Sequence, residues 1–318
     1  MVMTTVRVLV ALSVGLSLAA SACGKEVTPP EPIPAEGLPP SVEEMFFGSS
    51  RGCRDGLDCA SGACSFGACR GLVSIDEPWR VETIAEKLRE RITQEAALAP
   101  RVVATLSAIA HNDEERVAIR GRAVAALGVV GQVATLREAV VADLKDLLPK
   151  APAAVGEVVA GSLARLGDAS GVELLVMLAG SERLPVALDA MRALGALGRA
   201  PGRPSLSDEV LVTLLSAVSV DLDLEIQRAA IEALGDLGDA RAMIPLARHL
   251  TAGPESLAEV EAIALAKLAP KLGAGVTAPG GTDPLRWDAW IAANRPPAPP
   301  AYTPRGHDSV DDIELPTP

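Results

Sequence analysis

One short phrase occurs four times in this chain, and it limits the possible folds more than any other feature. The copies read AVAALGVVG ending at Gly131, AGSLARLG ending at Gly167, DAMRALGALG ending at Gly198 and AAIEALGDLG ending at Gly238. A run of Ala and Leu closed by Gly is typical of the last turns of a helix. The closing glycines are 36, 31 and 40 residues apart. Self-similarity at this period predicts stacked helical units, an architecture that usually holds a partner on its surface.

The last copy shows most clearly how one unit is built. In LEIQRAAIEALGDLG, Ile226, Ala230 and Leu234 recur every four residues, and charged side chains occupy another face. This is the pattern of an amphipathic helix, and Gly238 suits the left-handed position after it. The segment ARAMIPLARHL that follows predicts the partner helix. The same two-helix unit can be drawn over three earlier segments, residues 114–148, 152–179 and 184–218.

Helical patterns continue on both sides of these units. Pro78 suits the first turn of a helix, and another helix is expected over residues 101–110. Near the other end, Asp283 precedes a proline and is a good N-cap, and Trp287 and Trp290 share one helical face. The tryptophans form either an aromatic binding platform or a lid on the stack. The lid is favoured, because terminal repeats must cover apolar surface.

The core of such a stack must consist of Ala, Leu and Val, because aromatic residues make up only 2% of the chain. One leucine lies four residues before each closing glycine, and we expect it to face the layer between the helices. These leucines are Leu127, Leu163, Leu194 and Leu234.

Two segments resemble a known repeat family. ALGDLGDARAMIPLARHL (residues 233–250) and LARLGDASGVELLVML (residues 163–178) are similar to HEAT repeats, and most of all to the HEAT-like repeats of bilin lyases. The resemblance covers residues 114–250 well and extends to 79–295. Together with the repeats, this resemblance predicts an all-α fold. We expect a right-handed, HEAT-like α-solenoid of about six antiparallel helix pairs over residues 79–295. A small disulfide-rich segment precedes it. The family implies protein–protein binding and supplies no catalytic position.

The resemblance also suggests which residues meet a partner. In HEAT-like stacks the second helix of each pair tends to line the concave side. The polar candidates on those helices are Arg137, Arg241, Arg248 and His249. Arginine is favoured at interface hot spots, where it can make bidentate bonds to a carboxylate. The alternative is that these side chains only keep the surface solvated.

The N-terminus is typical of an exported chain. Residues 1–22 contain Arg7 and a short apolar stretch, as a signal peptide does. ASAC, which ends at Cys23, resembles the lipobox of bacterial lipoproteins, and we expect Cys23 to be lipidated. In that family Gly24 implies sorting to the outer membrane, facing the periplasm or the surface. Residues 23–48 are predicted to be a Pro-rich linker, which holds the protein off the membrane as a semi-rigid spacer.

Residues 49–72 contain four cysteines, Cys53, Cys59, Cys64 and Cys69, among small and polar residues that offer no core. In an exported chain this predicts two disulfides, with three possible pairings. A zinc site is the weaker alternative, since zinc sites commonly use cysteines two residues apart. We therefore expect no bound metal. Residues 296–318 are Pro-rich and acidic, and are predicted to be a disordered tail.

The rest of the sequence excludes several functions. The net charge is −12, and no Lys and Arg cluster suggests nucleic-acid binding. There is no nucleophile elbow, P-loop or dinucleotide fingerprint, and the three histidines do not pair at ligand spacing. We expect no cofactor and no catalysis. The favoured hypothesis is a protein-binding scaffold of the cell envelope with an unknown protein partner. The alternatives are a purely structural envelope component and, less favoured, a bilin-lyase-like enzyme.

Overall fold

The computed structural model describes residues 38–54, 59–61, 63–65, 68–75, 78–200, 208–218 and 222–301. The chain divides into two units, Met1–Ile33 and Pro34–Pro318, and all described residues belong to the second. The predicted signal peptide, Cys23 and most of the C-terminal tail lie outside the described residues. Within the described part, no helix is both long and apolar enough to cross a membrane.

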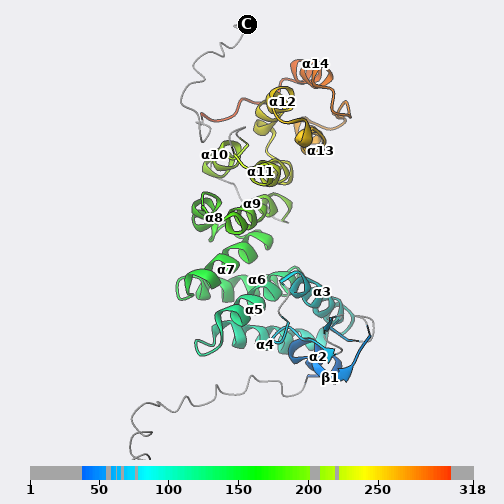
Figure 1. Cartoon of the computed structure of the whole chain (residues 1–318), viewed down its shortest axis with the longest axis vertical. Coiled ribbons are helices and arrows are strands. Elements are labelled where there is room, and N and C mark those ends of the chain that lie inside the picture. Colours follow the sequence, from blue (N-terminus) through cyan, green and yellow to red (C-terminus); the bar gives the residue numbers. More distant parts are fainter. Residues whose placement is uncertain are drawn as a thin grey trace, which may run out of the picture. The chain divides into compact units, whose positions relative to one another are not determined.

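The described chain is an all-α solenoid of helix pairs, as the repeats predict (Figure 1). The first helices of the pairs are α3 (Pro78–Gln94), α5 (Val117–Val130), α7 (Ala153–Arg165), α9 (Leu184–Arg199), α11 (Leu224–Leu237) and α13 (Ala258–Leu268). The second helices are α4 (Ala99–His111), α6 (Arg137–Leu147), α8 (Val172–Ala179), α10 (Asp208–Ser216), α12 (Met243–Ala252) and α14 (Pro284–Asn294). Single 3-10 turns lead into or extend some of them: η2 (Ala96–Leu98), η3 (Ala240–Ala242), η4 (Glu255–Leu257) and η5 (Ala269–Leu272).

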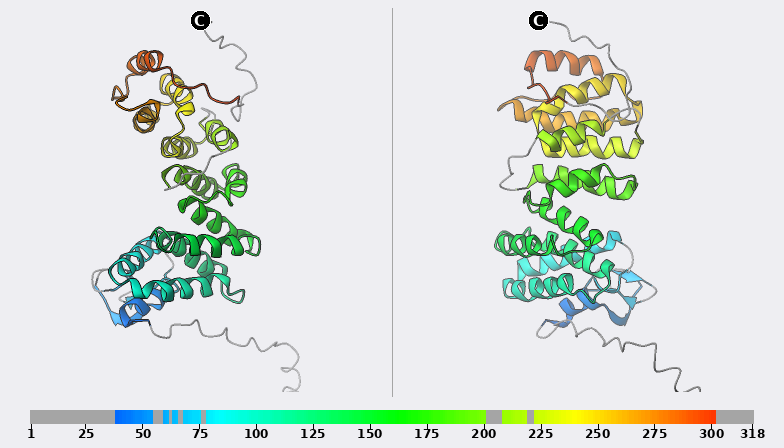
Figure 2. Two further views of the ribbon diagram at one scale, coloured as in Figure 1. Left: turned by 180° about the vertical axis from the view of Figure 1, so that it is seen from behind. Right: turned by 90° about the vertical axis from the view of Figure 1, so that its left-hand side faces the viewer.

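The first helices form one layer and the second helices another, and the left view of Figure 2 shows the upper pairs of the stack roughly end-on. Each first helix packs on the next first helix, from α3 through α5, α7, α9 and α11 to α13. Each second helix packs against the first helix of the following pair: α4 on α5, α6 on α7, α8 on α9, α10 on α11 and α12 on α13. Packing therefore continues from each pair to the next along the stack.

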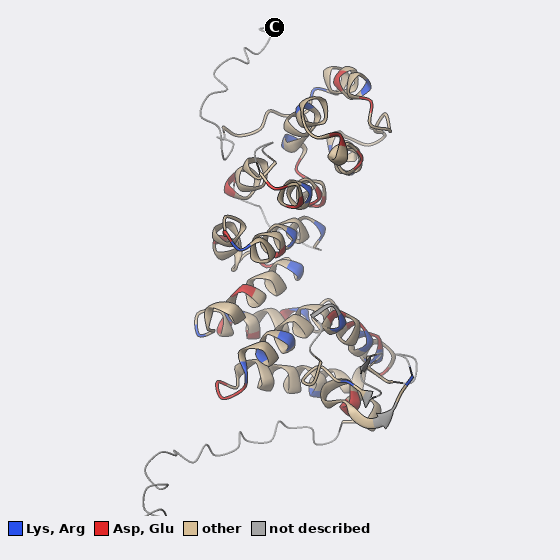
Figure 3. Cartoon of the chain, in the orientation of Figure 1, with Lys and Arg blue, Asp and Glu red and all other residues tan. Residues whose placement is uncertain are grey.

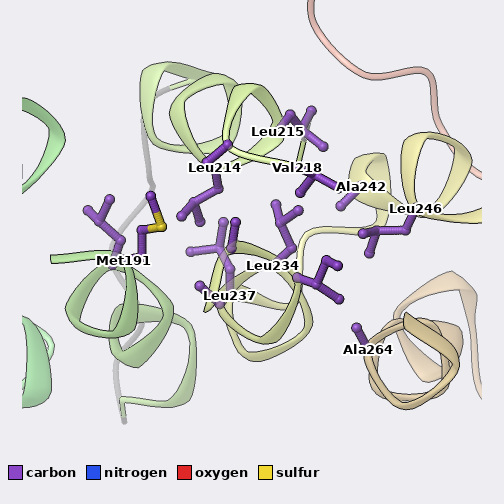
Figure 4. Close-up of a cluster of buried hydrophobic side chains, with 14 of the residues drawn as sticks. Met191, Leu214, Leu215, Val218, Leu234, Leu237, Ala242, Leu246 and Ala264 are labelled. Atoms are coloured by element: carbon purple, nitrogen blue, oxygen red, sulfur yellow. The ribbon is translucent and has the colours of Figure 1, made fainter. Parts of the chain in front are cut away.

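The four repeated leucines lie where the period predicts. Leu127, Leu163, Leu194 and Leu234 are all fully buried. In Figure 4, Leu234 and Leu237 of α11 lie among Met191, Leu214 and Leu246, which come from α9, α10 and α12.

The four closing glycines differ in their roles. Gly167 and Gly238 have positive φ angles of 81° and 67°, as expected after a helix end. Gly131 also closes a helix, as the C-cap of α5, but it is αR with φ −65°, whereas Gly198 lies one residue before the end of α9. At Gly198 the missing side chain serves packing instead, because a Cβ there would overlap the backbone of Leu237 on α11.

The last part of the predicted linker is folded. Residues 40–47 form helix α2 (Pro40–Phe47), whose Val42, Met45 and Phe46 are buried and which packs against α3. The prolines there misled the prediction. Pro40 occupies the first turn of a helix, a position where the missing N–H costs nothing.

The Cys-rich segment forms a small antiparallel sheet, β1 (Ser49–Gly52), β2 (Cys64–Ser65) and β3 (Ala68–Cys69), in the order β1-β3-β2. The chain that follows the four cysteines contributes apolar side chains to the core, since Leu72 and Ile75 are fully buried. Leu72 N donates to Met45 O at 2.8 Å, and Arg122 Nη1 of α5 donates to Val73 O at 3.1 Å. The segment is therefore packed onto the solenoid.

The last helix covers the other end of the core. Asp283 caps α14 by accepting a hydrogen bond from Leu285 N at 3.0 Å. Trp287 is fully buried in the main apolar cluster, and its Nε1 donates to Gly281 O at 2.9 Å. Trp290 packs edge-on against it, with ring centroids 5.7 Å apart. This burial agrees with a lid rather than with an exposed binding platform.

Candidate partner-binding surface

The four candidate partner residues come from different parts of the second-helix layer. Arg137 begins α6, Arg241 lies in η3, and Arg248 and His249 lie in the second half of α12. The structure gives them different environments.

Arg241 is engaged within the solenoid. Its guanidinium contacts Asp208 Oδ1 at 2.5 Å and Asp239 Oδ2 at 2.8 Å. Hydrogen bonds to Asp239 and Asp208 raise the pKa of Arg241 above its ordinary value. Because Asp208 begins α10, this arginine ties the turn before α12 to the preceding second helix. Its geometry is that of a structural cross-link.

His249 is also turned inward. Its Nδ1 contacts Glu261 Oε1 on α13, and the side chains of His249 and Glu261 are only 9% and 1% exposed. Arg248, next to it, is exposed. Of these three residues, only Arg248 offers its charged group to an approaching protein.

Arg137 lies at an open cavity of about 350 Å³ between α6 and the turn from α7 to α8. The cavity is lined by Ala134, Arg137, Glu138, Val141, Leu166, Gly167 and Asp168. Burial alone would raise the pKa of Asp168, but hydrogen bonds from Ser170 and the charge of Lys145 lower it below its ordinary value. The cavity therefore combines one basic and two acidic side chains with apolar residues.

Met177 on α8 was not predicted as a site residue. It is 65% exposed, although Leu175 and Ala179 on the same helix are buried. The signal was present in GVELLVMLAG, where Glu173 is the only charged residue. So many apolar residues exceed what the buried stripe of one amphipathic helix needs. Met177 was missed because only polar side chains were considered as candidates.

Charged side chains of the first-helix layer connect different helix pairs. Asp236 of α11 contacts Arg199 of α9 and, at 2.8 Å, Lys267 Nζ of α13. Arg165 of α7 contacts Glu82 of α3 at 3.0 Å. Figure 3 shows basic and acidic residues interspersed along the described helices. These contacts link first helices of different pairs.

In the Cys-rich segment, Cys59 and Cys69 form a disulfide with Cα atoms 5.4 Å apart, which confirms a disulfide in this segment. Cys53 is disulfide-bonded as well. The backbone of Cys64 lies opposite Cys69 in the β2–β3 ladder. Cys53, Cys59 and Cys69 are thus disulfide-bonded in the described part of the chain.

The described fold is an α-solenoid of helix pairs. Residues 226–251, from α11 to α12, match the family of PBS lyase HEAT-like repeats. No curated protein matches the sequence. Among solved structures, the crystal structure of an engineered protein from the Northeast Structural Genomics Consortium is similar. It is 21% identical, with a TM-score of 0.39, over 62% of this chain and 94% of that chain.

Proposed function

We propose that this chain is a non-catalytic lipoprotein of the cell envelope whose solenoid binds another protein through its second-helix layer, around α6 and α8. The observation that carries the proposal is Met177, a large apolar side chain that is 65% exposed. Methionine is flexible and polarizable, and it is common on surfaces that adapt to a partner. Arginine and methionine are both enriched at protein interfaces.

The cavity beside Arg137 supplies polar anchors for the same partner. A protein that presents a carboxylate can pair with the guanidinium of Arg137, and a basic side chain can pair with Glu138 or Asp168. Such charges fix orientation and specificity, whereas apolar contact around Met177 supplies affinity. Arg248 of α12 is a further charged contact of this layer.

The cellular side of the proposal is supported by sequence alone. The apolar segment before ASAC and the prolines after Cys23 suit a lipid anchor followed by a spacer. Such an anchor would hold the solenoid at the outer membrane with its surfaces free for a partner. Disulfide-bonded cysteines fit an oxidising compartment.

The test places a photoreactive amino acid at Met177 in the full chain and, as a matched control, at Glu232, which is exposed on the first helix α11. In intact cells we expect a discrete cross-linked adduct from position 177 and none from position 232. Met177→Asp should abolish the partner's co-purification and leave the melting temperature unchanged. Equal adducts from both positions would contradict this surface. No adduct from either would favour a purely structural component.

A further inference from the structure

The sulfur atoms of the Cys-rich segment lie unusually close together. The sulfur atoms of Cys53, Cys59 and Cys69 all lie within 4.8 Å of one another. Cys59 and Cys69 are buried and Cys53 is half-buried. The sheet explains this gathering. Cys53 directly follows β1, and β1 pairs with β3, in which Cys69 lies opposite Cys64 of β2.

Contacts other than the disulfides hold these positions. The carboxylate of Glu44 on α2 accepts hydrogen bonds from Ala60 N at 2.7 Å and from Ser49 Oγ at 3.0 Å. Val73 N donates to Phe46 O at 2.9 Å. A Cβ at Gly71 would overlap the backbone of Gly48. The two segments of the chain can therefore approach this closely only because residue 71 is glycine. Opening the S–S bonds therefore leaves the cysteines near one another.

We propose that the Cys-rich segment, when its disulfides are reduced, is a binding site for one thiophilic divalent cation such as Zn²⁺. Cys53, Cys59 and Cys69 are the ligands that the sulfur positions support. Zinc bound by thiolates at about 2.3 Å in a tetrahedron has its sulfurs roughly 3.8 Å apart. That separation lies within the 4.8 Å that already encloses the three sulfur atoms.

Cation binding by this segment requires that its disulfides first be reduced. Each disulfide takes two electrons and two protons from a dithiol or phosphine reductant and gives two thiols, while the reductant becomes a disulfide or a phosphine oxide. Cation binding then displaces the thiol protons, because the thiolate is the ligand form. A sulfur in a disulfide has no thiolate to offer. The oxidised segment is therefore metal-free and the reduced segment is metal-bound.

The experiment uses the full chain carrying Cys23→Ser, so that the fifth cysteine contributes no thiol. The protein is reduced with a phosphine under anaerobic conditions and titrated with Co²⁺, whose tetrahedral thiolate complexes absorb strongly. We expect one Co²⁺ per chain, displacement by Zn²⁺, and no such absorption from the same chain left oxidised. Cys53→Ser should lose the thiolate absorption, whereas the neighbouring control Ser61→Ala should keep it.

A second measurement does not depend on variants that fold poorly. In the reduced Cys23→Ser chain, Zn²⁺ should lower the number of alkylated thiols by at least three, as read by intact mass, and a chelator should restore their reaction. Circular dichroism checks that the helices persist. Absence of thiolate absorption on reduction, full absorption in Cys53→Ser, or alkylation unaffected by Zn²⁺ would each overturn the proposal. The outcome is independent of whether the solenoid binds a protein.

Discussion

At the scale of single residues, the repeated leucines were predictable and their neighbours were not. The position four residues before the closing glycine puts Leu127, Leu163, Leu194 and Leu234 on the buried face, because a helical period alone fixes the face. The role of each glycine depends on which neighbouring helix packs against it. Gly198 faces the backbone of Leu237, a residue 39 positions later, and no local pattern reveals that approach.

Leu234→Ala should destabilise the protein by about 2–5 kcal/mol, because it leaves a cavity in the cluster between α9, α10, α11 and α12. Glu232→Ala, on the exposed face of the same helix, should change the free energy of unfolding by at most about 0.5 kcal/mol. Urea melts of the two variants make the comparison. Equal effects would mean that the assigned helical face is wrong.

Gly198→Ala should destabilise by about 1–3 kcal/mol, because its Cβ would force α9 away from α11. The matched control is Gly121→Ala in α5, where an added Cβ meets only Val158 Cγ2, at an ordinary 3.7 Å. The control should stabilise by about 0.5–1 kcal/mol, since alanine favours the helix. If both variants shift the thermal midpoint in the same direction, close packing at Gly198 is not important.

Asp168 should contribute stability that depends on pH. Its pKa is lowered in the folded protein, where hydrogen bonds from Ser170 and the charge of Lys145 outweigh the effect of burial. A carboxyl group with a lowered folded pKa stabilises at pH values above its unfolded value of about 3.9, and this contribution is lost as pH falls through the folded pKa. Asp168→Asn should therefore be less stable than the parent at pH 7, with a difference that shrinks at about pH 3. A constant difference in urea melts at both pH values would contradict this.

At the scale of elements, the helices of the repeats were predictable, and the errors occurred where composition was ambiguous. Residues 40–47 follow a Pro-rich stretch and were expected to extend it, yet they fold because Val42, Met45 and Phe46 can be buried beside α3. Only tertiary packing decides this, since a helix of eight residues is not stable alone. The last helix, in contrast, carried clear local signals, an N-cap aspartate followed by proline.

Trp287→Ala should loosen the end of the stack selectively. Trp287 is fully buried against the main cluster, and truncation of such a side chain costs about 3–5 kcal/mol. In a repeat protein each unit depends mainly on its neighbours. Hydrogen exchange should therefore accelerate in α12, α13 and α14 and remain unchanged in α5 and α7. Arg286→Ala, exposed on the same helix, is the control. Uniform acceleration would show that the solenoid unfolds as one unit.

At the scale of the whole molecule, the fold class followed from the repeat period, but the candidate surface did so only in part. Arg241 and His249 were chosen as polar residues on second helices, and their partners Asp208 and Glu261 belong to other elements. Such contacts can be predicted only when it is known which elements pack together. Arg137 and Arg248 remain candidates, and Met177 joins them through its exposure. Reversing Arg241 would test stability rather than binding, so position 177 is the better probe of a partner.

Attachment of the whole molecule to the membrane should depend on Cys23 alone among the five cysteines. A thioether-linked diacylglycerol and an amide-linked chain on one residue supply enough buried CH₂ groups for stable anchoring, whereas a single chain binds only reversibly. Cells fed a palmitate analogue should label the wild-type chain and leave Cys23→Ala unlabelled and in the soluble fraction. Cys53→Ala is the matched control, and it should be labelled like the wild type because Cys53 lies in the disulfide-bonded segment. Equal labelling of Cys23→Ala and wild type would rule out the lipoprotein assignment and leave the solenoid without an anchor at this residue.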